Sequence, residues 1–231
     1  MFRMNLSHFQ YAAIFNYGYW FLMLNLYFAI ANIPFILALS TLQFVPSNMI
    51  YYFITLIPMG PALAALLAAL NKIVVEKDIS VTKDYWHFFK GKFAESLRLW
   101  SITLALLFIL AIDIAVFMDK SVFAIVSPLF IILSILLLNM VVCGLVIMAK
   151  TKHSLKTLFI LSFYYSIKKY YITFLNTILA CFFIFILLIK PVFAFMVLPS
   201  FIFFLIVRNS SLILRNESSV KGILLKGSAK H

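Results

Sequence analysis

Charged side chains are scarce in this chain, and acidic ones are the scarcest. Only 11% of its 231 residues are Asp, Glu, Lys or Arg, and 65% are hydrophobic. Soluble domains are about a quarter charged and roughly half apolar, so this composition excludes a soluble globular fold. Runs of about 18 or more nearly uncharged residues indicate membrane-spanning helices instead. We therefore predict an all-α fold, a polytopic transmembrane helical bundle.

Signatures of enzymes and of metal sites are missing from the sequence. Cys143 and Cys181 lie in apolar runs without metal-ligand spacing, so we interpret them as small hydrophobic side chains. The four histidines are scattered: His8, His87, His153 and His231. Neither a G-x-x-x-x-G-K-S/T phosphate loop nor a G-x-S-x-G motif occurs, and the loop 71–98 is too short for a soluble catalytic core. We expect no metal, no cofactor and no enzyme, with a membrane-embedded enzyme left open as a third hypothesis.

Six apolar runs are long enough to cross a membrane. They cover about residues 17–41, 49–74, 99–118, 122–148, 172–189 and 191–207 of one integral membrane domain, 1–231. The first run continues past the short apolar core of a signal peptide, so we interpret it as an uncleaved span. The last two form one block of 36 residues, about 54 Å as a helix against roughly 30 Å of hydrocarbon. This block must fold back, and Lys190-Pro191 is the predicted turn.

The second span is interrupted by Pro58, Gly60 and Pro61. Proline removes a backbone donor and clashes with the preceding turn, so we predict a kink or a break. Carbonyls near Ile54 and Ile57 then need donors from neighbouring helices or from water. A broken span can also frame a binding site at mid-membrane, as in transporters. A packing kink is the favoured interpretation, and the binding site stays open.

The predicted loop 75–98 is rich in aromatic and basic residues. We expect a helix from Thr82, an N-cap candidate, with Asp84 in the first turn. One stripe recurs every four residues along it, formed by Tyr85, Phe89, Phe93 and Leu97 and flanked by Trp86 and Trp100. Basic residues fill much of the rest, which is typical of a helix lying in the membrane interface. The other long loop, 149–171, contains a second aromatic and basic stretch.

Basic residues are distributed unevenly between the two sides of the predicted bundle. Of the 19 Lys and Arg, 17 fall in the N-terminus, in residues 72–98 and 150–169, and in the basic tail 208–231. The other 2 are Lys120 and Lys190. The positive-inside rule therefore places both termini and both long loops in the cytoplasm. The charges cluster between apolar runs, which indicates contact with the anionic cytoplasmic leaflet rather than with nucleic acid.

A few polar residues lie inside the predicted spans. Asp113 is a functional candidate, because a carboxylate at mid-membrane costs about 2.5–3.5 kcal/mol. It lies past the middle of its span, toward the outer face, where water, Lys120 or Lys190 can stabilise its charge. We therefore favour a carboxylate without a functional role over a functional one. The spans also contain four asparagines: Asn25, Asn32, Asn139 and Asn176. Asn25 and Asn32 share one helix face, and we expect these amides mainly to hydrogen-bond between helices.

Three segments share a pattern with a known family. They are Asn25-Leu26 followed by Pro34, Pro58-x-Gly60-Pro61-Ala62 with its Ala/Leu-rich continuation, and Asp84-Tyr-Trp-His-Phe-Phe-Lys-Gly-Lys-Phe93. Together they resemble the YesL-like family of small bacterial integral membrane proteins, over about residues 15–210. The resemblance implies a multi-pass protein of the plasma membrane. No catalytic or binding residue is established for that family, so none is transferred.

Two functions follow as expectations. Genes of the resembled family often lie beside those of carbohydrate ABC transporters and two-component systems. This implies an accessory or regulatory subunit whose partners are ABC-transporter subunits or a sensor kinase. The alternative is a small solute transporter or channel that uses the broken second span and Asp113. A transporter predicts a water-accessible cavity reaching Pro58, whereas an accessory subunit predicts a closed bundle with an exposed flank.

Overall fold

The computed structural model describes residues 3–43, 45–118, 127–150 and 154–214. Within these ranges every regular element is a helix, which confirms the all-α prediction. In chain order they are α1 (Arg3–Ala31), α2 (Ile33–Thr41), the 3-10 helix η1 (Pro46–Asn48), α3 (Met49–Thr55), α4 (Met59–Glu76), α5 (Val81–Gly91), α6 (Phe93–Met118), α7 (Ser127–Lys150), α8 (Leu155–Lys168), α9 (Tyr170–Ile189) and α10 (Pro191–Leu214). The predictions on Lys120, on residues 122–126, on His153 and on the tail from residue 215 to His231 lie outside these ranges.

Five helices are long and apolar enough to cross a membrane by themselves: α4, α6, α7, α9 and α10. The helices α1 and α2 pass the same test as a pair, but they are bent by 72° where they meet. Counting this pair as one broken span gives the six spans that the sequence predicts. These helices have the lengths and composition of a multi-pass membrane protein.

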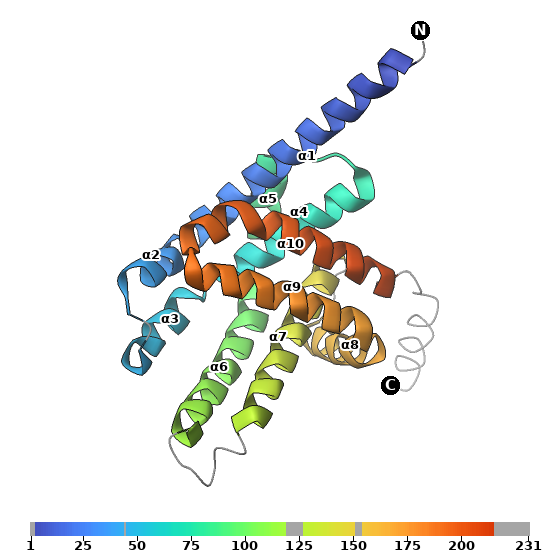
Figure 1. Ribbon diagram of the computed structural model, residues 1–231. Helices are drawn as coiled ribbons and strands as arrows, with labels where there is room; N and C mark the ends of the chain where they lie inside the picture. Colours follow the sequence, from blue (N-terminus) through green and yellow to red (C-terminus); the bar gives the residue numbers. More distant parts are fainter. Residues whose placement is uncertain (1–2, 44, 119–126, 151–153, 215–231) are drawn as a thin grey trace, which may run out of the picture.

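The first span differs from the single helix expected over residues 17–41. α1 ends at Ala31 and α2 begins at Ile33, with Asn32 between them. Pro34 explains the break, because it lies in the first turn of α2 and has no N–H to continue the hydrogen bonds of α1. Figure 1 shows the N-terminal half of α1 extending beyond the rest of the bundle.

The second span breaks at its prolines, as predicted. The separate helices α3 and α4 replace one helix over residues 49–74. Pro58 occupies the N-cap position of α4, and Pro61 lies in the first turn. A missing N–H costs no helical hydrogen bond at these positions. The break therefore starts a new helix and leaves α4 intact.

The helix α4 lies at the centre of the bundle. Every residue from Met59 to Leu70 is buried, and α1, α5, α6, α7 and α10 all pack against this helix. Its alanines explain this position, because small side chains let neighbouring backbones approach closely. Figure 1 shows α4 largely covered by α10 in that view.

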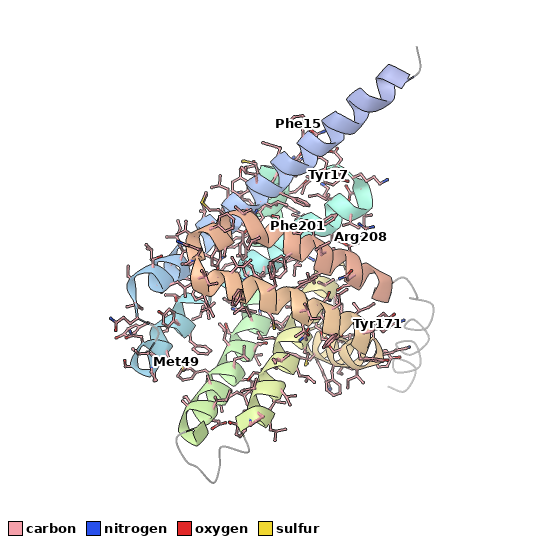
Figure 2. All side chains as sticks on the ribbon, viewed as in Figure 1. Phe15, Tyr17, Met49, Tyr171, Phe201 and Arg208 are labelled. Atoms are coloured by element: carbon pink, nitrogen blue, oxygen red, sulfur yellow. The ribbon has the colours of Figure 1, made fainter. Side chains whose placement is uncertain are left out.

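The long C-terminal apolar block folds back at the predicted turn. α9 ends at Ile189 and α10 begins at Pro191, and the two helices pack side by side (Figure 1). Phe183 of α9 makes edge-to-face contact with Phe195 of α10. The outer surface of this hairpin is apolar and aromatic. Tyr171 and Phe201, labelled in Figure 2, are each more than half exposed.

Candidate functional site

The break before α4 is filled by an aromatic side chain from α6. Gly60 is buried, and a Cβ atom built on it would overlap Cβ and Cγ of Trp100. Trp100 itself is 5% exposed. Glycine at position 60 therefore permits a close approach of α4 and α6 that no other residue type would allow without a shift of one helix.

The same tryptophan supplies a hydrogen bond to the broken backbone. Its indole Nε1 donates to the carbonyl oxygen of Leu56 at 2.8 Å. Leu56 O also accepts from the backbone N–H of Met59 at 3.1 Å, and Ile54 O accepts from the N–H of Ile57 at 3.2 Å. The predicted need for donors is thus met at Ile54 by a tight turn, and the neighbouring Leu56 carbonyl is bonded by a tight turn and by a neighbouring helix. The sequence analysis missed this contact, because it interpreted Trp100 as a residue beside the aromatic stripe of the predicted surface helix.

The two best-formed grooves on the described part of the chain both lie away from this break. One groove of about 620 Å³ lies between α1 and α10, lined by Leu22, Leu26, Lys190, Pro191, Val192, Phe193, Met196 and Val197. A second, of about 590 Å³, lies along α8. Neither is lined by Pro58, Gly60 or Pro61. The geometry at the break is that of a packed joint between α3, α4 and α6.

Asn25 clamps α1 to a kinked segment of α10. Its Nδ2 donates to the carbonyl of Val197 at 2.9 Å, and its Oδ1 accepts from the backbone N–H of Ser200 at 2.7 Å. Pro199 lies inside α10 and disturbs the helical hydrogen bonds around it. The Asn25 amide satisfies one carbonyl and one N–H there, and so confirms the expected bond between helices. The proline is the sequence signal for this clamp.

The other three span asparagines behave differently from one another. Asn176 donates to the Ser210 hydroxyl at 3.3 Å and joins α9 to α10, as expected. For Asn32 and Asn139 the expectation is wrong, because each donates to a carbonyl one turn earlier in its own chain segment. Asn32 is fully buried, and its Oδ1 has no hydrogen-bond partner in the described chain. It lies at the bend between α1 and α2, where α1 can no longer supply a regular helical donor.

Asp113 lies on α6 and is half-buried. Among the described residues, none forms a hydrogen bond or an ion pair with its carboxylate. Lys190 therefore does not pair with it, and Lys120 lies outside the described ranges. In the described chain, no three His, Cys, Asp or Glu side chains are grouped as metal ligands would be. Among the described residues, Asp113 is thus an isolated carboxylate.

The start of α5 is held by a carboxylate. α5 begins at Val81 rather than at the Thr82 N-cap that we expected. The reason is Asp84, whose Oδ2 accepts the backbone N–H of the N-cap residue Ser80 at 2.9 Å, as the acidic residue of a capping box does. The same oxygen accepts from Lys72 Nζ of α4 at 2.7 Å. One carboxylate therefore both starts α5 and ties it to α4.

The end of α5 divides the predicted stripe. α5 stops at Gly91, a poor helix former, and α6 begins after Lys92. The Nζ of Lys92 donates to the carbonyl of Met148 in the last turn of α7, a favourable place for a cation. Phe93 and Leu97 therefore lie on α6 rather than on the helix of Tyr85. The prediction of one continuous surface helix through Leu97 is wrong.

The aromatic face of α5 contacts the protein instead of facing outward. Tyr85 is fully buried, and its ring centroid lies 5.7 Å from that of Tyr27 on α1. Trp86 lies at 6.0 Å from the same ring, and the Tyr27 hydroxyl shares a hydrogen bond of 2.7 Å with Thr82. Phe89 is half-buried against the core. The stripe that we expected in lipid is largely an internal contact with α1 and α4.

The Tyr85 hydroxyl is buried and has no hydrogen-bond partner in the described chain. Burial raises the pKa of Tyr85 well above its usual range, because the charged phenolate would lose its hydration. This side chain stays neutral at physiological pH and is unsuited to proton transfer. Its contribution is packing.

The opposite face of α5 is exposed and basic. Lys83, His87 and Lys90 all project from it, and the nearest acidic group on this helix, Asp84, is already engaged by Lys72. α5 packs against α1 and α4, and Figure 1 shows it behind α1. This basic face, defined by Lys83, His87 and Lys90, is thus available to a partner.

Comparison with known proteins adds one family. Residues 21–114 match a family model described as protein of unknown function, DUF624. The match runs from α1 into α6 and so includes the Gly60–Trp100 joint and α5, although it covers less than half of the chain. No curated protein and no solved structure matches the chain. The finer resemblance to YesL-like proteins stays a prediction.

Proposed function

We propose that this chain is a non-enzymatic accessory subunit of the plasma membrane, with both termini in the cytoplasm. The packed break in the second span carries the proposal. A channel or transporter working through Pro58 needs a water path to that point. Trp100 instead fills the space beside Gly60 and donates a hydrogen bond to the Leu56 carbonyl. The same contact disfavours the alternative of a small solute transporter or channel.

The basic face of α5 is the proposed docking surface. Its lysines carry positive charge at exposed positions, while its aromatic residues hold the helix on α1 and α4. A helix fixed on one side and charged on the other suits a polar contact with an acidic surface of a partner. The excess of basic residues in the same loop supports a cytoplasmic location for that contact.

The partner class comes from the family resemblance. It favours a subunit of a carbohydrate ABC transporter, or a sensor kinase that responds to carbohydrate. In either case the chain would regulate or stabilise a complex rather than move the solute itself. The closed bundle is consistent with both partners, and the identity of the co-purifying protein separates them.

Affinity purification from native membranes tests this proposal. The tagged chain is crosslinked in cells, extracted in mild detergent, and its partners are identified by mass spectrometry. We expect subunits of one carbohydrate transporter, or one sensor kinase, to be enriched. Lys83→Glu with Lys90→Glu should abolish that recovery, because both substitutions reverse the charge of the basic face.

The matched control is Lys77→Glu with Lys156→Glu, which makes the same charge change at exposed positions away from that face. This control should recover the partner normally. Equal recovery with both double variants would contradict docking through α5. Enrichment of proteins unrelated to carbohydrate uptake would contradict the assigned partner class.

A further inference from the structure

The helix α8 lies between two membrane-spanning helices without crossing the membrane itself. With 14 residues it is about 21 Å long, shorter than the roughly 30 Å hydrocarbon core. It packs against α7 and α9, which are both long and apolar enough to span. α8 therefore lies at one face of the membrane, where it joins the ends of two spans.

The two sides of α8 differ in what covers them. One side packs on the bundle through Leu158 and Tyr165, both buried. The other side leaves three large apolar side chains more than half exposed: Ile160, Phe163 and Ile167. Their spacing of three and four residues makes them one continuous stripe. At a membrane face, such a stripe is stable when it enters the headgroup and acyl-chain boundary.

A groove runs along this stripe and ends at a cation. Its volume is about 590 Å³, and it is lined by Phe159, Ile160, Phe163, Tyr164, Ile167 and Lys168. Lys168 Nζ donates to the Tyr164 hydroxyl at 2.7 Å and lies 5.0 Å from the centre of its ring. These two contacts hold the ammonium group at the end of the groove.

The lysines at the end of α8 lack acidic partners among the described residues. Lys168 and Lys169 follow each other at the junction of α8 and α9. The sequence contains no Asp or Glu from residue 120 to residue 216. In the described chain, neither lysine forms an ion pair. Their counter-ions must therefore come from outside the described chain, and at a membrane face anionic headgroups are an available source.

We propose that α8 binds an anionic phospholipid, with an acyl chain in the groove and the phosphate beside Lys168 and Lys169. The apolar stripe and the uncompensated lysines both favour this ligand. α5 offers the contrast, because its aromatic residues are covered by α1 and its Asp84 pairs with Lys72. This lipid site does not depend on the accessory role proposed above.

Lipid competition on the purified full-length chain tests the site. The protein in neutral detergent is titrated with a fluorescent phosphatidylglycerol, and binding is read by energy transfer from its tryptophans. We expect phosphatidylglycerol to bind more tightly than phosphatidylcholine. Lys168→Gln with Lys169→Gln should weaken phosphatidylglycerol binding about 25-fold, about fivefold for each lysine. Lys77→Gln with Arg98→Gln, the control at exposed positions outside α8, should leave it unchanged.

Three outcomes of this titration would overturn the proposal. Equal affinity for the two lipids would remove the role of the phosphate charge. An equal loss in the control variant would mean a non-specific effect of net charge. Displacement of the lipid by inorganic phosphate at equal concentration would mean a free-anion site that makes no use of the groove.

A second measurement separates lipid from a protein partner. Ile160→Cys in a background with Cys143→Ala and Cys181→Ala carries a fluorescent probe, and the chain is placed in nanodiscs containing phosphatidylglycerol. We expect shallow brominated lipid to quench the probe and aqueous iodide to leave it bright. Efficient quenching by iodide would show that the stripe faces water, as an unoccupied protein-docking surface would, and would overturn the lipid site.

Discussion

Trp100 packs directly on Gly60, in the space that any larger residue at position 60 would need. Its indole N–H donates to the Leu56 carbonyl at 2.8 Å, four residues before that glycine. One side chain therefore both fills the break in the second span and supplies a hydrogen bond there. In a membrane this combination matters, because an unpaired carbonyl has no water to bond.

Gly60→Ala should destabilise the bundle. The added methyl group would overlap Trp100, so α4 and α6 must separate. Overpacking of this kind costs about 1–3 kcal/mol. We expect a lower temperature of thermal unfolding in detergent micelles. Gly18→Ala is the matched control, because nothing lies within 4 Å of the Cβ it would add. Equal unfolding temperatures for the two variants would contradict the close approach at Gly60.

Asn25→Leu should weaken the contact between α1 and α10. The substitution removes bonds to Val197 and Ser200 and leaves two backbone groups unpaired next to Pro199. Hydrogen bonds between membrane helices contribute about 0.6–1.7 kcal/mol each, so a loss of about 1–3 kcal/mol is expected. The readout is denaturation by added sodium dodecyl sulfate.

Asn139→Leu serves as the control for that experiment. Asn139 bonds only to the Ile135 carbonyl of its own helix, and that carbonyl remains in place after the substitution. Its effect on denaturation should be small. A loss in Asn139→Leu as large as that in Asn25→Leu would mean that the clamp on α10 contributes nothing specific.

Asp84→Ala should loosen α5 without unfolding the bundle. The carboxylate accepts hydrogen bonds from Ser80 and from Lys72, and the ion pair is only partly exposed. Its removal should therefore cost about 1–2 kcal/mol of the free energy that holds α5 on the bundle. Hydrogen exchange over residues 80–91 should accelerate, while exchange in α4 stays slow. Glu76→Ala is the control, because its carboxylate is 3.9 Å from Lys72 and 59% exposed. Faster exchange in both variants would argue against a specific tie.

The orientation derived from the basic residues predicts a labelling pattern. Ser47 and Lys90 are both exposed and lie on opposite sides of the predicted topology. In a cysteine-free background, Ser47→Cys should react with a membrane-impermeant maleimide in intact cells. Lys90→Cys should react only after the membrane is opened. Labelling of Lys90→Cys in sealed cells would reverse the orientation and remove the cytoplasmic docking surface.

The sequence predicts the positions of helix breaks and turns well, and most of these predictions rest on prolines. Pro58 and Pro61 mark the start of α4, and Lys190-Pro191 marks the turn between α9 and α10. A missing N–H acts within one turn of helix, so its effect does not depend on the rest of the fold. Pro34 also lacks an N–H, so the bend at Asn32 could have been predicted from the sequence by the same reasoning. Pro199 likewise signals the disturbed segment that Asn25 clamps.

The sequence could not predict which surface, lipid or a neighbouring helix, covers the apolar side of each amphipathic helix. Tyr85 and Phe163 both lie on helices that combine aromatic residues with lysines, yet Tyr85 is buried against Tyr27 and Phe163 is half exposed. An aromatic stripe is equally stable against lipid and against a neighbouring helix, because both surfaces are apolar. Only the tertiary arrangement decides between them. The contact of Trp100 with Leu56 depends on that arrangement as well, across 44 positions of sequence.

The most direct test of the closed break is the fluorescence of Trp100 as the sole tryptophan. Trp20→Phe and Trp86→Phe leave Trp100 alone, and the chain is reconstituted in liposomes. The packed joint predicts blue-shifted emission and little quenching by aqueous iodide or acrylamide, relative to the same protein dissolved in sodium dodecyl sulfate. Quenching in liposomes as strong as that of free indole would mean that water reaches the break, and would contradict the closed bundle.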